Sequence, residues 1–338
     1  MELLKQLYMI SSPSRGEKKM RKFIRRWIAE NVPEAVVEID PTGNVKVVKG
    51  MSDTYPCIVA HMDQVQKPHE RDFRVYGVDG KVFGLSPSVM EQRGLGADDK
   101  NGIWVALKCL QKYDVMKCAF FVGEEIGCVG SDAVDMAFFK DCRWVVQCDR
   151  KGGSDLITVA GAEDLCSDEF LADADCAKFG YAEAHGLMTD VMTLKERGLG
   201  VSCVNMSCGY YAPHTEKEYT DVGELRNCLA FVESMVENMT KVYPHERVEP
   251  DYSQFGYGDG YDYGYGYGKY GDYAGYEGYG VSKNGYTLTD AEALVYEYIE
   301  NSPDIPDDEL VELVSDWTDI SAWRIREFVQ EARAYYNI

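Results

Sequence analysis

Three apolar segments of the sequence each end in side chains that can bind a cation: His61 and Asp63, then Glu124 and Glu125, then Asp149. Short apolar segments rich in β-branched residues are typical of buried strands. Adjacent acids at the end of a buried strand are costly to bury unless a cation or a proton neutralises them. The pattern therefore predicts an acidic, cation-binding site, with one acid of the Glu124-Glu125 pair on the cation and its neighbour holding a water.

Two further residues extend this set. Asp98 follows a glycine-rich segment and directly precedes an apolar helical pattern, and His214 follows Tyr210-Tyr211-Ala-Pro. A carboxylate at the position of Asp98 can bridge two cations through its two oxygens. Alternatively, Asp98 or its neighbour Asp99 caps the helix, which is an equally common use of an acid at a helix start.

His61 and Asp63 are two residues apart in the sequence. Alternate residues of an extended segment point the same way, so the two side chains can share a site. A metal-binding imidazole is usually oriented by a second group that accepts a hydrogen bond from its other nitrogen, and Asp63 can supply that support. A histidine at a strand end is more often an ordinary polar residue, so this assignment depends on the whole set. Nitrogen and oxygen ligands of this kind suit two divalent cations, with Zn²⁺ expected and Co²⁺ or Mn²⁺ as alternatives.

The elements that must position these residues alternate between strand-like and helical patterns over residues 1–250. Strands are expected at 36–39, 45–48, 57–60, 119–122, 144–148 and 201–204, and helices at 16–29, 101–113, 168–178 and 221–239. This alternation predicts an α/β fold in which helices cover both faces of a sheet, giving three α/β/α layers. Ligands of open α/β sheets collect at one edge, where several strands end.

The remainder of the chain differs in composition. Residues 251–280 contain ten Tyr and ten Gly, so 251–285 is interpreted as a low-complexity linker, with weak self-association through tyrosines as the alternative. Helical patterns return in 286–338, beginning with a possible capping box at Thr289 and Glu292 and continuing at 307–315 and 321–336. This small helical module is either a docking site for a protein partner or a packing appendage.

Charge and composition exclude several classes of partner. The net charge of −22 disfavours nucleic acid and anionic membranes, because the field of the protein repels phosphate. No apolar run approaches the roughly 20 residues that span a bilayer. The first residues resemble an amphipathic helix rather than an export signal, and the eleven cysteines lack a C-x-x-C pair. We therefore expect a cytoplasmic protein with reduced, mostly buried thiols.

Taken together, the motifs resemble the co-catalytic zinc exopeptidases of the M20 group, particularly the peptidase T type. The resemblance spans about residues 1–239 and rests on His61-x-Asp63, Gly96-Ala-Asp98-Asp99-Lys100, Gly123-Glu124-Glu125, Asp149 and His214. It implies that Asp98 bridges two metals, with His61 and Asp149 completing one site and Glu125 and His214 the other. It also implies Asp63 as support for His61, Glu124 as the general base, and a cis peptide between Asp98 and Asp99. The fold that the resemblance implies is the three-layer α/β/α zinc-exopeptidase fold with a mixed central sheet.

One departure from this group concerns its lid domain. Members usually insert a lid between the last acidic ligand and the final histidine, but only 64 residues separate Asp149 from His214. Those residues have the pattern of further sheet-domain elements, so no lid is expected. The arrangement then also resembles the lidless M28 group, with M42 enzymes as a third possibility. Without a lid, Tyr210, Tyr211 or His185 could replace the oxyanion stabilisation that the lid supplies in this group, although a histidine such as His185 is more often an ordinary surface residue.

The expected function is hydrolysis of short peptides by a metal-activated water, with aminopeptidase action favoured by the resemblance. A carboxypeptidase or an N-acyl amino acid amidohydrolase is the first alternative. The alternative of another class is an inactive metal-binding scaffold that recruits partners through residues 286–338. Loss of a ligand would favour the scaffold, and every ligand of the motif is present in the sequence.

Overall fold

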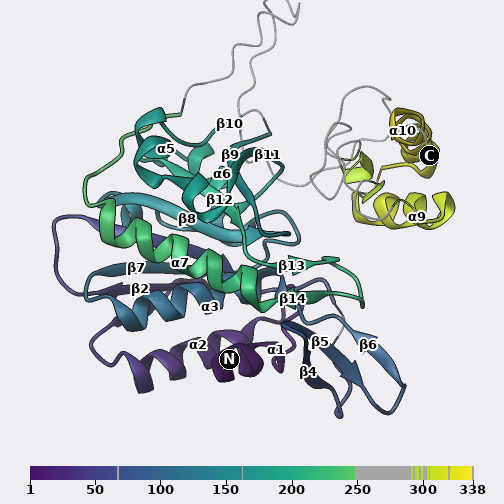
Figure 1. Cartoon of the computed structure of the whole chain (residues 1–338), viewed down its shortest axis with the longest axis horizontal. Helices are drawn as coiled ribbons and strands as arrows, with labels where there is room; N and C mark the ends of the chain where they lie inside the picture. Colours follow the sequence, from purple (N-terminus) through teal and green to yellow (C-terminus); the bar gives the residue numbers. More distant parts are fainter. Residues whose placement is uncertain are drawn as a thin grey trace, which may run out of the picture. The chain divides into compact units, whose positions relative to one another are not determined.

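The computed structural model describes residues 1–66, 68–161 and 163–247, and near the C-terminus 291, 294–296, 298–299, 303, 305–318 and 320–336. The chain divides into two compact units, Met1–Val248 and Glu249–Ile338 (Figure 1).

The first unit is built on a nine-stranded sheet in the order β1-β2-β7-β3-β8-β12-β9-β10, with β11 also pairing with β9. The strands are β1 (Val36–Ile39), β2 (Val45–Lys49), β3 (Tyr55–His61), β7 (Met116–Phe121), β8 (Cys142–Arg150), β9 (Asp155–Ala160), β10 (Glu163–Asp164), β11 (Ala182–Gly186) and β12 (Cys203–Ser207). β3 runs parallel to both β7 and β8, and β12 runs parallel to β8. The outer pairs β1–β2, β2–β7 and β12–β9 are antiparallel, so the sheet is mixed.

Alternation along the central strands produces two apolar faces. In β3, Ile58 and Ala60 belong to one buried cluster, whereas Cys57 and Val59 belong to another. Helices cover the first face, and these are α1 (Glu2–Tyr8), α2 (Lys18–Asn31), α3 (Ala97–Lys112), α5 (Asp168–Ala174), the 3₁₀ helix η2 (Cys176–Phe179) and α7 (Val222–Asn238). The second face carries α4 (Val129–Ala133), the 3₁₀ helix η1 (Met136–Phe139) and α6 (Asp190–Glu196).

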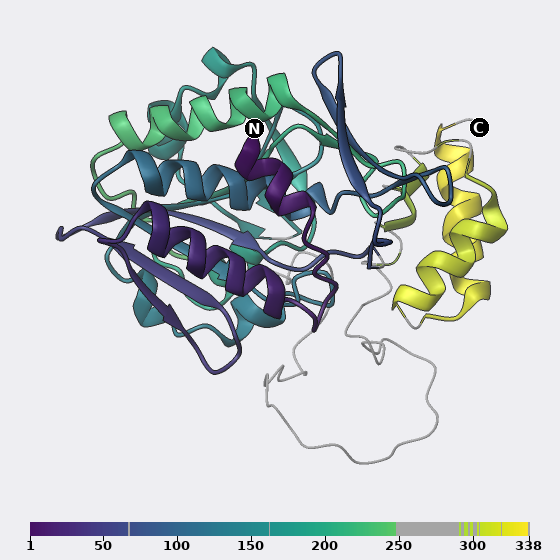
Figure 2. The same ribbon diagram turned by 90° about the horizontal axis from the view of Figure 1, so that it is seen from below.

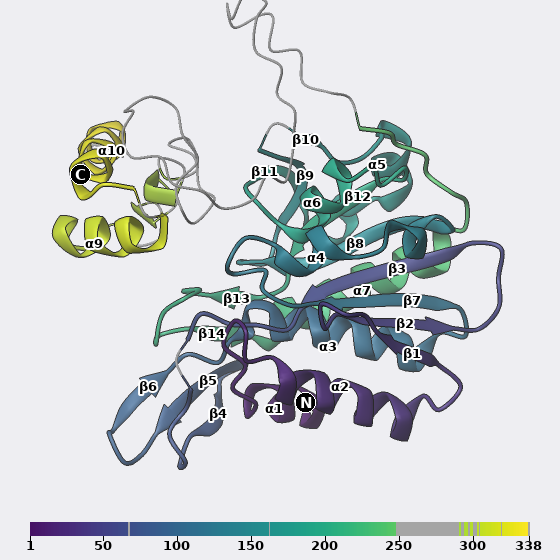
Figure 3. The same cartoon turned by 180° about the vertical axis from the view of Figure 1, so that it is seen from behind.

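Two views separate these layers. In Figure 2, α3 (blue) and α7 (green) lie side by side, and Figure 3 shows α4 and α6 from the other side of the molecule. The predicted α/β fold with a mixed central sheet is therefore confirmed. Residues 150–202, between the last acidic ligand candidate and β12, contribute β9 to β11, α5 and α6 to this same body.

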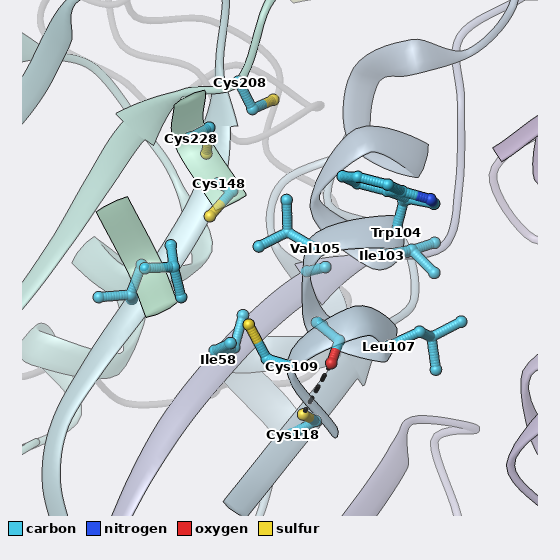
Figure 4. Close-up of a cluster of buried hydrophobic side chains, with 14 of the residues drawn as sticks. Ile58, Ile103, Trp104, Val105, Leu107, Cys109, Cys118, Cys148, Cys208 and Cys228 are labelled. Atoms are coloured by element: carbon cyan, nitrogen blue, oxygen red, sulfur yellow. Dashed lines mark hydrogen bonds between the residues drawn. The ribbon is translucent and has the colours of Figure 1, made fainter. Parts of the chain in front are cut away.

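Helix α3 is buried along most of its length. Its apolar residues lie against the strands together with several thiols, and the Sγ atom of Cys118 is 3.9 Å from the carbonyl oxygen of Ala106 (Figure 4). All eleven cysteines are free, and each except Cys176 is buried. The burial expected of these thiols is confirmed, since they fill the space between helix and sheet as small apolar side chains.

A second, smaller sheet was not predicted. It has the order β13-β14-β5-β4 with β6 paired to β5, and its strands are β4 (Arg74–Val78), β5 (Lys81–Ser86), β6 (Glu91–Arg93), β13 (Tyr210–Tyr211) and β14 (Tyr219–Asp221). It joins segments more than 120 residues apart, for example Tyr219 opposite Phe83. Its short, partly exposed strands carry little hydrophobic periodicity, which is why the sequence pattern missed them.

The second unit contains α9 (Asp307–Thr318) and α10 (Ala322–Tyr336), which confirms the two helices expected in this region. The described residues between 291 and 299 are also helical. A separate buried cluster holds this unit together, and it includes Ile299, Leu310, Val314, Ile325 and Phe328. The predicted linker 251–285 and the proposed cap at Thr289 lie outside the described residues. Within the described part of the chain, no helix is long and apolar enough to cross a membrane.

Candidate metal centre

The sequence-predicted ligands come from neighbouring elements. His61 is the last residue of β3, Glu124 and Glu125 follow β7, and Asp149 lies on β8. Because β7, β3 and β8 are parallel neighbours, their carboxyl ends meet at one edge of the sheet. Asp149 lies within β8 rather than after it, since this strand continues to Arg150.

These residues gather in two groups that share Asp98. One consists of His61, Asp98 and Asp149, the other of Asp98, Glu125 and His214, and in each group the possible ligand atoms lie within 4.8 Å of one another. Asp98 Oδ1 is 3.0 Å from His61 Nε2, whereas Asp98 Oδ2 is 3.2 Å from His214 Nε2. His61 Nε2 is also 3.6 Å from Asp149 Oδ1, and His214 Nε2 is 3.1 Å from Glu125 Oε2. The two oxygens of Asp98 thus face different groups, as a bridging ligand requires.

The start of α3 separates the roles of Asp98 and Asp99. Gly96 has a left-handed φ of 62°, and the peptide bond between Asp98 and Asp99 is cis, as the family resemblance implied. Asp99 Oδ1 accepts a hydrogen bond from the N–H of Gly102 at 2.9 Å, and its Oδ2 accepts one from the N–H of His61 at 3.1 Å. Asp99 therefore satisfies the backbone at the helix start, and the side chain of Asp98 is left to face the two imidazoles.

The carboxylate of Asp63 contacts both the loop after β7 and the imidazole of His61. Its Oδ1 accepts the N–H of Glu124 at 3.0 Å and lies 3.4 Å from His61 Nδ1. Its Oδ2 accepts the hydroxyl of Ser14 at 2.7 Å and the N–H of Glu125 at 3.3 Å. One buried carboxylate thus holds the backbone of the two adjacent glutamates and lies beside the imidazole of His61.

Glu124 lies beside the ligand candidates without belonging to either group. Its Oε2 is 3.9 Å from His61 Nε2. Burial raises the pKa of Glu124 well above its usual range, the charges of Asp149 and Glu125 raise it further, and His61 opposes them. The direction of this shift follows from the burial of several acids close together.

The three candidates for substrate contact lie in different places. The hydroxyl of Tyr210 is 3.2 Å from Asp98 Oδ2 and 3.4 Å from Asp149 Oδ1, so this buried side chain reaches the centre. Tyr211 instead donates its hydroxyl to Glu224 at 2.7 Å.

His185 is an exposed residue of β11 that pairs with Val159. Among the contacts of the described residues, none joins Tyr211 or His185 to a ligand candidate. The structure therefore brings only Tyr210, of these three, to the centre.

Sequence reasoning missed several supporting residues. Glu218 is buried, and its Oε1 accepts the N–H of Asp98 at 3.3 Å. Gln147 and Asn205 are buried polar residues on the strands β8 and β12, and both contact Asp149. The signal for the last two was a polar side chain inside an otherwise apolar strand pattern.

The donor set fits divalent cations. Two imidazoles and three carboxylates supply only nitrogen and oxygen ligands, with a carboxylate positioned between two groups. Oε1 of Glu125 is buried and has no hydrogen-bond partner within the described part of the chain. Burying several ionised carboxylates beside only two imidazoles costs much free energy unless further positive charge is added.

Comparison with known proteins gives no match to any family model over this sequence. One curated protein, a putative [LysW]-lysine/[LysW]-ornithine hydrolase of Pyrobaculum aerophilum, is 40% identical over 67 residues. That match covers 20% of this chain and 19% of the hydrolase, so it spans only a small part of either protein.

Several solved structures share the fold over most of their length. Aminopeptidase PepT of Bacillus cereus superimposes with a TM-score of 0.58 at 16% identity, covering 70% of this chain and 97% of PepT. A TET aminopeptidase from a Thaumarchaeota archaeon gives 0.56 at 12% identity, covering 72% and 97%. A tripeptidase of Staphylococcus aureus gives 0.55 at 12% identity, covering 70% and 96%. The chain therefore has the mixed α/β fold seen in these peptidases.

Proposed function

We propose that this protein is a two-metal exopeptidase that removes amino-terminal residues from short peptides. The observation that carries the proposal is the position of Asp98, whose two oxygens face a histidine of each ligand group. The fold similarity to aminopeptidases and a tripeptidase supports the same class of reaction.

In this proposal His61 and Asp149 hold one cation, Glu125 and His214 hold the other, and Asp98 is shared. Zn²⁺ is the expected ion, with Co²⁺ or Mn²⁺ as alternatives. When bound, such a pair of cations polarises the scissile carbonyl and lowers the pKa of water.

Glu124 supplies the proton transfer. It accepts a proton from water at Oε2 and delivers it to the leaving amine. Asp63 keeps Glu124 and Glu125 in place through their backbone N–H groups. His61 has a fully buried side chain, whereas about a fifth of the His214 side chain (21%) is exposed, so we propose that substrate approaches from the side of His214.

Glu124→Gln tests the central assignment. We expect turnover to be lost while two cations still bind, because the amide cannot accept the proton and Glu124 belongs to neither ligand group. The control is Glu233→Gln on α7, which removes an ion pair with Lys112 at the end of α3 and should leave kcat unchanged. Activity in Glu124→Gln close to that of the unmutated protein would contradict the mechanism.

A peptide panel separates the alternatives. Aminopeptidase action requires cleavage of C-blocked peptides and none of N-blocked ones, whereas a carboxypeptidase gives the opposite result. The short match to a [LysW]-lysine/[LysW]-ornithine hydrolase makes N-acyl-lysine and N-acyl-ornithine useful additions, since they detect an amidohydrolase. Binding of cations without any hydrolysis would favour the scaffold with a partner-recruiting module at 286–338.

A further inference from the structure

A buried amide and a buried carboxylate lie behind the Asp149 side of the candidate centre. Gln147 precedes Asp149 by two residues on β8, so both side chains point to the same face of the strand. Asp190 is the first residue of α6, which packs on that face. Gln147 and Asp190 are both fully buried, and the proposed chemistry uses neither.

The orientation of the Gln147 amide is fixed by its neighbours. Its Oε1 accepts two hydrogen bonds, from the hydroxyl of Thr189 at 2.7 Å and from the N–H of Val191 at 3.1 Å. With the oxygen held on that side, the NH₂ group must face the other way. It donates to Asp149 Oδ2 at 3.1 Å and to Asp190 Oδ2 at 3.1 Å. Each of the two N–H bonds therefore has a carboxylate acceptor.

Asp190 is in turn held from its other oxygen. Ser131 donates its hydroxyl to Asp190 Oδ1 at 2.6 Å. A buried carboxylate is tolerated when it accepts hydrogen bonds, and those to a charged group are stronger than neutral ones. Asp190 consequently holds the Gln147 amide in one position, because turning the amide would remove the donor from Asp190 Oδ2 and place the amide oxygen against it.

The two carboxylate oxygens of Asp149 therefore have different partners. Gln147 engages Oδ2, while Oδ1 faces His61 Nε2 at 3.6 Å. The backbone of Asp149 is fixed independently, since Asn205 accepts its N–H at 2.9 Å and donates to its carbonyl at 3.0 Å. Gln147 therefore holds Oδ2 of this side chain, and the hydroxyl of Tyr210 lies 3.4 Å from its Oδ1.

We propose that Gln147, anchored by Asp190, is a positioning residue that presents a single oxygen of Asp149 to the cation held with His61. The inference rests on the proposed function, because it assigns these two residues to one half of the same centre. It assigns no such role toward the half formed by Glu125 and His214.

The test is a set of three full-length variants, Gln147→Met, Asp190→Asn and the double substitution, titrated with Co²⁺ or Zn²⁺ after chelator treatment. Methionine has a volume similar to that of glutamine and donates no hydrogen bond. We expect one of the two binding constants to weaken by about 10- to 100-fold in Gln147→Met, with the other unchanged. The visible spectrum of bound Co²⁺ should change for the weakened site only.

The double variant distinguishes positioning from a general loss of packing. If Asp190 acts through Gln147, the double variant binds cations as Gln147→Met alone does, whereas independent effects would add. Thr158→Val, a change at another buried polar residue of the same sheet, serves as the control and should leave both constants unchanged. If Gln147→Met fails to fold, Ser131→Ala, which loosens Asp190, should weaken the same single site to a smaller extent.

The outcomes separate this inference from the proposed function. Equal weakening of both sites, no weakening, or additive losses would overturn the role of Gln147 and leave the two-metal centre intact. Selective weakening together with full activity of Glu124→Gln would support Gln147 and contradict the mechanism. An unmutated protein that binds neither Co²⁺ nor Zn²⁺ would overturn both.

Discussion

The hydroxyl group of Tyr210 lies between two carboxylates of the candidate centre, Asp98, which both ligand groups share, and Asp149, which belongs to the group of His61. It approaches Asp98 and Asp149 within 3.2 and 3.4 Å, and the side chain is buried. The single hydrogen of this hydroxyl can be donated to either carboxylate, and the bond favours the ionised form of the one that accepts it. Tyr210 is also the only one of the three predicted substrate-contact residues whose described contacts reach the ligand candidates.

Tyr210→Phe should lower cation affinity or kcat by about 10- to 100-fold, the range typical of lost support to metal ligands. The matched control is Tyr211→Phe, which loses only the contact with Glu224 and should behave like the unmutated protein. Cation titration and steady-state kinetics on both variants measure the difference. Equal cation affinity and equal kcat in the two variants would show that the Tyr210 hydroxyl does not support the ligands.

His69 provides a pH-dependent element of stability away from the ligand candidates. Its Nε2 donates to the carbonyl of Gly94 at 2.9 Å, its ring stacks on Phe73, and its Nδ1 is buried without a partner within the described part of the chain. Burial lowers the pKa of His69 to about 4, and the positive charge of Lys100 contributes to the shift. The folded protein therefore holds this imidazole neutral.

Because the pKa of His69 in the folded state lies below its unfolded value of about 6.5, the unfolded chain binds more protons between these values. This contribution to stability is full above about pH 6.5 and is lost as the pH falls toward about 4, by at most about 1.4 kcal/mol per pH unit. His69→Gln should show a shallower decline of unfolding free energy over that interval in urea titrations. Parallel curves for the two proteins would contradict the assignment.

At the scale of elements, the loop after β7 depends on a close approach between α4 and β7. A Cβ atom on Gly130 would lie 2.4 Å from Oδ1 of Asn44 and 2.6 Å from the backbone N and O of Val122. The N–H of Gly130 donates to the carbonyl of Val122 at 2.8 Å, so the two segments cannot separate without losing this bond. This contact closes the loop that carries Glu124 and Glu125.

Gly130→Ala should destabilise the protein by about 1–3 kcal/mol, the usual cost of overpacking, and should reduce kcat by displacing the two glutamates. Thermal unfolding and kinetics measure the two effects. Gly200→Ala is the control, because a Cβ atom there meets nothing within 4 Å. A Gly130→Ala variant as stable and active as this control would show that the close approach is unimportant.

At the scale of the whole molecule, every ligand candidate lies in Met1–Val248, and Glu249–Ile338 has a buried cluster of its own. The second unit is strongly acidic, with nineteen acidic and five basic residues of the chain's 57 and 35. Removing it would change the net charge from −22 to −8. The role of residues 286–338 as a docking module remains a proposal.

A protein truncated after Val248 should fold and should cleave uncharged peptides with unchanged kcat, because its core and its ligand candidates are complete. Cationic peptides test the charge of the removed unit. A loss of activity toward them that shrinks as salt is raised would assign the unit an electrostatic role, since salt screens exposed charges. Loss of all activity in a folded truncated protein would contradict the expectation that Met1–Val248 contains the complete centre.

Much of the arrangement follows from the sequence. The strands at Val36–Ile39 and Tyr55–His61 and the helices α3, α7, α9 and α10 agree with the predicted segments within a few residues. β12 begins at Cys203 rather than near Val201, which forms an isolated bridge with Pro244. These elements are readable because their apolar periodicity is local.

By itself, the sequence determined the residue types of the centre and the strand ends that carry them, because hydrophobic periodicity and parallel pairing direct those ends to one edge. Tertiary structure alone decided which oxygen of Asp98 faces which histidine, and that Asp99 rather than Asp98 completes the helix start. It also decided that Tyr210 reaches the centre whereas Tyr211 turns to Glu224. The contacts of Asp98 with the two histidines, of Asp99 with the N–H of His61 and of Tyr210 with Asp98 join segments far apart in the chain, and such contacts leave no periodic trace in the sequence.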